Sequence, residues 1–171
     1  VLKLISIVNR IHAVSKIEAE RIQRNFPSAR RKIIVVPNGV DEDVFKYKWL
    51  GKNSSYMMYS GRIEKYKRLE VAIDLARKLN LKLLIIGKGP HKRKLIEYAR
   101  KHWPDMVYFM SPQPRKKYLR LLSRAKFAIN PSPHEAFSVF IAEALAMGVP
   151  AITSSEIARI FSNVTDEYIS T

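Results

Sequence analysis

Two glutamates in one stretch of the chain could bind hydroxyl groups. Glu135 lies in a turn-prone loop, and Glu143 lies inside the helix that the following residues predict from about Ser138 onward. An ionised carboxylate can only accept hydrogen bonds, so such a pair suits a ligand rich in hydroxyls. The loop also leads into a helix N-terminus, where unpaired N–H groups and the helix dipole attract phosphate. Phosphate and hydroxyls together indicate a sugar nucleotide, although two glutamates at this spacing could also simply cap and solvate a helix.

Two cations could neutralise a diphosphate. Gly61 and Arg62 directly follow a predicted strand, and Lys67 lies near the start of the next predicted helix. A glycine at a strand end lets the backbone approach a ligand, and the arginine fork matches phosphate oxygens. Arg62 and Lys67 could therefore stabilise the charge that a departing diphosphate gains. Lys65 and Arg68 are close enough in sequence to be mistaken for the functional cation, and all of them could be surface residues.

Other chemistry has weaker support. The turn Gly87-x-Gly89-Pro90 lacks the third glycine of a dinucleotide fingerprint and the Lys-Ser/Thr pair of a P-loop. No two of the four histidines have the spacing of a zinc site, and the chain has no cysteine. His134 beside Glu135 could act as a base, but a loop histidine is more often a surface residue. We expect no metal and no cofactor.

Alternating strands and helices must position these residues. Strands are predicted over 11–14, 33–36, 56–60, 81–86, 107–110, 127–130 and 150–153, and helices over 16–25, 66–79, 90–102, 111–124 and 138–148. Ser15 is expected to cap the first helix, with Glu18 completing a capping box. Residues 41–55 have an irregular, polar pattern. The four β-branched residues of 33–36 predict a strand buried on both faces.

The alternation from residue 33 to residue 153 predicts an α/β fold with a doubly wound, Rossmann-like parallel sheet. Ligands of such sheets bind beyond the carboxyl ends of the strands. Gly61, Gly87, Ser111 and Pro131 all follow those ends, so the fold and the candidate residues agree on one site.

The composition limits the function classes. The 171 residues have 47% hydrophobic and 27% charged content, which is typical of one globular domain. No apolar run is long enough to span a membrane, and no signal peptide is evident. Lys and Arg number 31 against 15 Asp and Glu, giving a net charge of +16. The excess could mark a solvated basic surface, an anionic membrane as partner or, less well supported, nucleic acid.

Taken in order, the motifs resemble the C-terminal lobe of the retaining GT-B glycosyltransferases of group 1. The matching blocks are Ala13-Val14-Ser15, Val36-Pro37-Asn38-Gly39-Val40-Asp41, Gly61-Arg62 with Lys67, Ile85-Ile86-Gly87-x-Gly89-Pro90, Pro131-Ser132, Glu135-x-Phe137 and Glu143-Ala144-x-Ala146-x-Gly148-x-Pro150. Each block alone is modest, but their order and spacing cover nearly the whole chain.

The resemblance implies roles for individual residues. Arg62 and Lys67 would bind the donor diphosphate and assist its departure, Glu135 would contact the transferred sugar, and these three would form the catalytic set. Glu143 would hold the ribose hydroxyls. The remaining donor contacts would come from the backbone at Gly61 and over Ala136, Phe137 and Ser138, and from the loops at Gly87 and from Ser111 to Gln113, which would face the base.

Three positions depart from the family pattern. Ala136 and Ser138 stand where glycine is common, and a Cβ there could narrow the sugar pocket or change the loop conformation. Arg68 stands where glycine commonly follows the lysine. We also expect residues 1–11 to be a remnant of the connection between lobes, because the chain begins at Val1, and the N-terminal lobe that supplies the acceptor site to be absent.

We therefore expect the donor-binding lobe of a retaining hexosyltransferase that uses a UDP-, GDP- or ADP-sugar and an unknown acceptor. The enzyme would be cytoplasmic, with the inner face of an anionic membrane as a candidate location, and the isolated lobe would turn over no donor. A non-catalytic module of the same fold that binds membrane or nucleic acid is the alternative. A related epimerase or phosphorylase shares the architecture, but no pyridoxal-binding lysine is identifiable.

Overall fold

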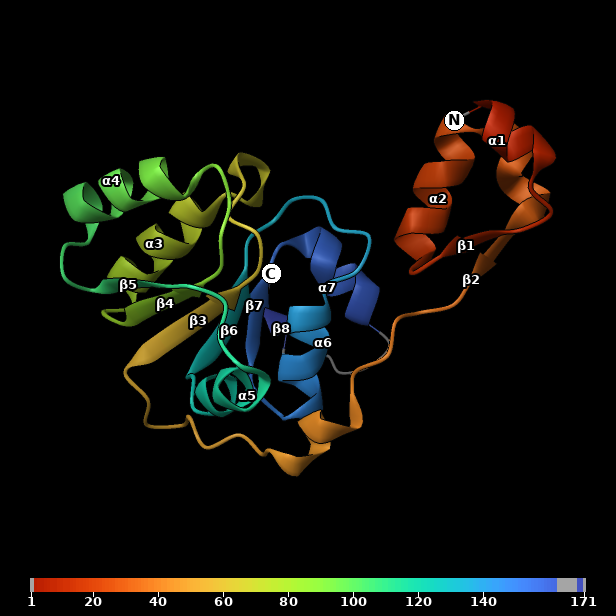
Figure 1. Ribbon diagram of the computed structural model, residues 1–171. Coiled ribbons are helices and arrows are strands. Elements are labelled where there is room, and N and C mark those ends of the chain that lie inside the picture. Colours follow the sequence, from red (N-terminus) through yellow and green to blue (C-terminus); the bar gives the residue numbers. More distant parts are fainter. Residues whose placement is uncertain (1, 163–168, 171) are drawn as a thin grey trace.

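Six parallel strands form the central sheet of the computed structural model, which describes residues 2–162 and 169–170 (Figure 1). The strands are β3 (Tyr56–Ser60), β4 (Lys82–Ile86), β5 (Val107–Met110), β6 (Phe127–Asn130), β7 (Ala151–Thr153) and β8 (Ile169–Ser170). Their spatial order is β5-β4-β3-β6-β7-β8, and every neighbouring pair is parallel. From β3 the chain adds β4 and β5 toward one edge of the sheet, and from β6 it adds β7 and β8 toward the other edge. This order confirms the predicted doubly wound fold, with its switch point between β3 and β6.

Helices cover both faces of the sheet because successive strand residues point to opposite sides. Met57 and Tyr59 of β3 pack with α3 (Leu69–Lys78) and α4 (Lys92–His102), whereas Met58 packs with α5 (Arg115–Ser123), α6 (Val139–Ala146) and α7 (Ser155–Phe161). The two hydrophobic clusters therefore lie back to back across one sheet, with α3 and α4 together on one side in Figure 1.

The N-terminal segment forms a separate small unit beside the main sheet (Figure 1). It contains α1 (Leu2–Ile7), β1 (Ile11–Ala13), α2 (Lys16–Asn25), the 3₁₀ helix η1 (Pro27–Lys32) and β2 (Ile33–Val35). Ser15 caps α2, as predicted, by accepting the N–H of Glu18 at 3.1 Å. The Glu18 carboxylate accepts from the N–H of Val14 at 2.7 Å, one residue before its place in a standard capping box.

The expectation that residues 33–36 form a strand buried on both faces is wrong. The strand β2 exists, but it pairs in parallel with β1 and lies outside the main sheet. Ile34, Val35 and Val36 are 46%, 40% and 51% exposed. β-Branched residues favour the extended backbone wherever they occur, so their run predicted the strand correctly but did not determine what covers it.

Further differences lie at element ends. Residues 41–55 are not wholly irregular, since they include the 3₁₀ helix η2 (Glu42–Lys46), in which Val44 is buried. The indole of Trp49 also fixes this segment by donating to the carbonyl of Ala125 at 3.0 Å. The sequence also gave no expectation for α7 or β8 after residue 153. Leu79, which directly follows α3, is 45% exposed.

The helix predicted from Tyr66 starts later, at Leu69, because the chain first makes the short 3₁₀ helix η3 (Lys65–Lys67). Arg68 joins the two helices in the left-handed conformation, with φ 51° and ψ 43°. This conformation crowds a Cβ against the following carbonyl and favours glycine. It gives a physical reason why glycine suits position 68.

Replacing Arg68 by glycine should raise the free energy of unfolding by about 0.5–1 kcal/mol, because relief of the left-handed strain exceeds the added entropy of the unfolded chain. Urea denaturation of the chain measures this change. Arg68→Ala is the control, since it removes the side chain but keeps the Cβ. A glycine variant no more stable than the alanine variant would contradict the explanation.

Candidate functional site

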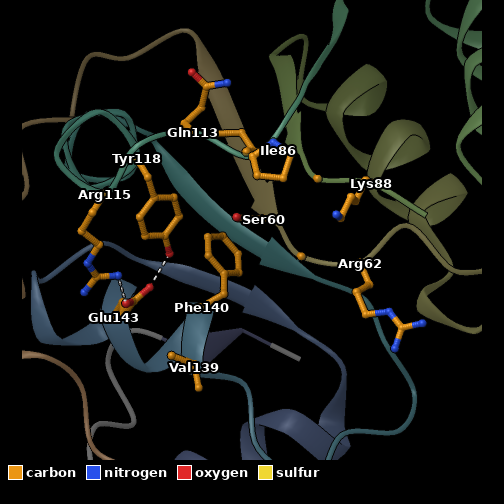
Figure 2. Close-up of a pocket in the computed structure, with 13 residues that line it drawn as sticks. Ser60, Arg62, Ile86, Lys88, Gln113, Arg115, Tyr118, Val139, Phe140 and Glu143 are labelled. Carbon is orange, nitrogen blue, oxygen red and sulfur yellow. Dashed lines mark hydrogen bonds and ion pairs between the residues drawn. The ribbon is translucent and has the colours of Figure 1, made fainter.

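A cavity of about 570 Å³ opens at the carboxyl ends of β3 and β4, beside the switch point of the sheet (Figure 2). The ends of β3 and β4, the loop before α5 and the first turns of α5 and α6 enclose it. Its lining residues are Ser60, Gly61, Arg62, Ile86, Gly87, Lys88, Pro112, Gln113, Arg115, Tyr118, Val139, Phe140 and Glu143. The position agrees with the rule that parallel sheets bind ligands beyond their carboxyl ends.

Two glycines form a close backbone contact at the edge of this cavity. The N–H of Gly61 donates to the carbonyl of Ile86 at 3.0 Å, so the ends of β3 and β4 stay paired beyond the strands. A Cβ added to Gly87 would lie 1.9 Å from the carbonyl oxygen of Gly61. Only glycine fits position 87, and the absent side chains leave the backbone open to a ligand.

Glu143 is the most enclosed carboxylate of the cavity. It projects from α6, its side chain is 6% exposed, and Figure 2 shows it joined to Arg115 and Tyr118. Nη1 of Arg115 donates to Oε1, and the phenol of Tyr118 donates to Oε2. Burial raises the pKa of Tyr118, and the hydrogen bond to Glu143 raises it further. The phenol is therefore protonated and can donate this hydrogen bond.

Arg115 also binds a second carboxylate outside the cavity. Its Nε and Nη2 donate to the two oxygens of Asp43 at 3.1 and 2.9 Å, a paired geometry that suits the planar fork. These hydrogen bonds raise the pKa of Arg115 and lower that of Asp43. Arg115 is therefore a fixed cation between η2 and α6.

Lys67 and Glu135, predicted to act on the diphosphate and the sugar, contact each other outside the lining of this cavity. Nζ of Lys67 donates to Oε1 of Glu135, and the two side chains are only 11% and 14% exposed. Burial distinguishes Lys67 from its neighbours Lys65 and Arg68, which are exposed.

The loop that carries Glu135 is held from below by Asn130 at the end of β6. Nδ2 of Asn130 donates to Glu135 at 3.2 Å and to the hydroxyl of Ser138 at 3.1 Å. Ser138 caps α6 with extended backbone, at φ −110° and ψ 93°, and Ala136 has no positive φ either. The serine and alanine at these positions are therefore compatible with the conformation of this loop.

Arg62 lines the rim of the cavity, but its side chain points outward in Figure 2. It is 77% exposed and pairs with Glu64 at 2.6 Å. The carbonyl of Arg62 is fixed by the phenol of Tyr59 at 2.8 Å. Arg62 must therefore leave Glu64 to reach a ligand in the cavity, and its long side chain is free to do so.

The other predicted residues divide between the cavity and its surroundings. Gln113 lines the cavity and donates to the carbonyl of Ser111 at 2.7 Å, while Ser111 itself is exposed outside the lining. The ring of Phe137 packs on Phe161 of α7, with ring centroids 5.2 Å apart. His134 is 69% exposed, and its Nδ1 lies 3.1 Å from a carboxylate oxygen of Glu156.

Sequence reasoning missed Arg115, Tyr118, Lys88 and Asp43. Arg115 and Tyr118 lie three residues apart on one helix, the spacing of neighbours on one face, so a search for cation–phenol pairs on predicted helices would have found them. The contact with Asp43 spans 72 residues and has no such local signal. Among the described residues, no three His, Asp or Glu side chains lie together as a metal site would require.

Comparisons with known proteins agree with this fold. Residues 41–167 match the family model described as glycosyl transferases group 1. A GDP-mannose-dependent alpha-(1-6)-phosphatidylinositol dimannoside mannosyltransferase of Mycobacterium tuberculosis is 30% identical over 135 residues, which cover 71% of this chain and 35% of that protein. The chain thus spans about a third of the length of that relative.

Solved structures show the same fold at lower identity. Sucrose-phosphate synthase from Thermosynechococcus elongatus superposes with a TM-score of 0.83 at 20% identity, over 98% of this chain and 46% of that one. An Anabaena protein, HepE, crystallised in complex with UDP and glucose, has a TM-score of 0.81 at 14% identity, over 99% of this chain and 52% of that one. These similarities show that the chain has the fold of one lobe of a GT-B glycosyltransferase.

Replacing Lys67 by methionine should lower the free energy of unfolding by about 3 kcal/mol, because it leaves the carboxylate of Glu135 buried without its cation. The double variant Lys67→Met/Glu135→Gln should recover more than half of the loss, since no charge is then unpaired. Chemical denaturation measures both. Lys65→Met is the matched control at an exposed lysine, with an expected effect within about 0.5 kcal/mol; equal losses at Lys65 and Lys67 would refute the buried pair.

Proposed function

This chain belongs to the group 1 glycosyltransferases, and we propose that it is the lobe that binds the nucleotide-sugar donor for a transfer that retains anomeric configuration. The observation that carries the proposal is the cavity beside the switch point, whose lining includes the enclosed carboxylate of Glu143 and the backbone of Gly61 and Gly87. Hydroxyl acceptors and an open backbone in one cavity suit a nucleoside diphosphate. The complexes of the Anabaena protein with UDP and sugar support the same class of ligand.

The proposed roles follow from the placement of each group. Glu143 binds the ribose hydroxyls, and the backbone at Gly61 and Gly87 lies along the diphosphate. Arg62 turns inward from the rim to contact phosphate oxygens, because its guanidinium is 77% exposed and its ion pair with Glu64 is therefore screened by solvent. The transferred sugar lies toward Glu135 and Lys67, where the buried pair offers both an acceptor and a cation.

The chemistry we assign breaks the bond between the anomeric carbon and the diphosphate oxygen and forms a bond from that carbon to an acceptor hydroxyl oxygen on the same face, while the hydroxyl proton passes to the departing diphosphate. Arg62 and Lys67 stabilise the negative charge that develops on the diphosphate. The proposal also includes a hexose as the transferred sugar, an acceptor that receives it, and a second lobe that covers the cavity during the reaction. Family membership and the enclosed Glu143 favour this enzyme role over a non-catalytic module. We propose that the donor binds without a metal ion.

Calorimetric titration of the chain with UDP, GDP and ADP tests the proposal. One nucleotide should bind, with the same affinity in EDTA, and Glu143→Ala should weaken it at least about tenfold because a charged hydrogen-bonding group is lost. Arg62→Ala should weaken it less, because the guanidinium is flexible and exposed. Lys65→Ala is the control for charge alone. If no nucleotide binds at millimolar concentration, the assignment of this cavity is wrong.

The charge of +16 also supports a location of the protein at an anionic membrane surface. Among the described residues, no helix has the length and apolar content needed to cross a bilayer, so contact would be through the surface. Phe45 and Leu50 are 63% and 73% exposed, and the N–H of Leu50 donates to the carbonyl of Ser123, next to the exposed Arg124. Lys48 is exposed on the same segment.

The chain should sediment with vesicles that contain phosphatidylglycerol and not with pure phosphatidylcholine vesicles, and binding should fall as salt rises. Phe45→Ser/Leu50→Ser should weaken binding several-fold because the apolar contact is lost. Leu79→Ser, at another exposed leucine, is the control. Equal binding to uncharged vesicles, or equal loss in the control, would contradict a membrane role for this surface.

A further inference from the structure

Arg115 occupies the junction between the cavity and the segment that precedes β3. It is the first residue of α5, and its guanidinium contacts Glu143 of α6 through Nη1 and Asp43 of η2 through Nε and Nη2. With both ends of the fork engaged, the guanidinium has one orientation. The carboxylate of Glu143 is thereby linked to η2, which lies 100 positions earlier in the sequence.

The hydrogen bonds of Glu143 leave a specific part of its capacity unused. A carboxylate has about four acceptor positions, two on each oxygen. Arg115 uses one position on Oε1, and Tyr118 uses one on Oε2. One position on each oxygen remains, and Glu143 lines the cavity. Two adjacent acceptors suit two adjacent hydroxyls, as on the 2′ and 3′ carbons of ribose.

Because Glu143 is enclosed, its charge and orientation depend on its hydrogen-bond partners Arg115 and Tyr118. Its side chain is only 6% exposed, so water cannot replace the hydrogen bonds and charge that Arg115 supplies. Tyr118 fixes one oxygen but carries no charge. Removal of Arg115 would leave a largely buried carboxylate with a single donor and with freedom to rotate away from the ligand.

We propose that Arg115 is the positioning residue of the ribose site. Arg115 fixes Glu143 so that one free acceptor position on each oxygen receives a ribose hydroxyl, and Asp43 fixes Arg115. This inference rests on the proposed function, since it requires a nucleotide in the cavity. Its specific consequence is that the preference for ribose over 2′-deoxyribose depends on Arg115, although Arg115 acts through Glu143.

The test compares the nucleotide that binds best with its 2′-deoxy form by calorimetry on the 171-residue chain. The unaltered chain should prefer the ribonucleotide at least about tenfold, the effect of one charged hydrogen bond. Arg115→Met should reduce this ratio to about threefold or less. Asp43→Asn should reduce it in the same direction but less. Arg120→Met is the matched control, an exposed arginine on the same helix, and should leave the ratio unchanged.

The outcomes separate the inference from the proposed function. Failure of the unaltered chain to bind any nucleotide overturns the proposed function and this inference with it. Nucleotide binding with an unchanged ratio in a folded Arg115→Met variant overturns this inference alone, since a purely structural role would weaken both nucleotides equally. If circular dichroism shows that Arg115→Met is unfolded, Arg115→Lys decides in its place: its lone ammonium cannot bridge both carboxylates, so a lower ratio supports the inference and an unchanged ratio overturns it.

Discussion

The parallel pairing of β3 with both β4 and β6 is the constraint on which the rest of the structure depends. It places β3 at the centre of the sheet, with Met57 and Tyr59 in one hydrophobic cluster and Met58 in the other. The connections that follow β3 and β6 lead to opposite sides of the sheet, so a crevice is left between the carboxyl ends of these two strands. The cavity and the buried pair of Lys67 and Glu135 both lie at the carboxyl ends of these strands.

Charge is handled differently in the two parts of the site. Lys67 and Glu135 neutralise each other in a nearly closed pair, which Asn130 supports with a further hydrogen bond. Glu143 instead has a cation that it shares with Asp43, so its charge is compensated while the side facing the cavity keeps acceptor capacity. In both places a mostly buried carboxylate is compensated by a neighbouring cation, and Glu143 also lines the cavity, where its remaining acceptor positions can receive a ligand.

The positions that depart from the family pattern have ordinary physical explanations. Ser138 replaces glycine where the backbone is extended, and it gains a capping hydrogen bond from the N–H of Ile141 at 3.4 Å. Arg68 replaces glycine in a left-handed turn, where it introduces local strain. Ser138 therefore fits the observed loop, whereas Arg68 introduces strain into the turn before α3.

Sequence alone determined the features that rest on local chemistry. Short apolar runs bounded by turn residues predicted β3, β5 and β6 at their observed bounds and the strand ends at which Gly61 and Gly87 lie. The serine before a helical pattern predicted the cap of α2. All of these features depend on residues within a few positions. Only the tertiary structure decided which faces are covered, as the exposed β2 shows, and which of the clustered cations is buried. It also decided that Arg115 joins Asp43 to Glu143. Burial and contacts across 72 residues depend on how whole elements pack, and no local pattern carries that information.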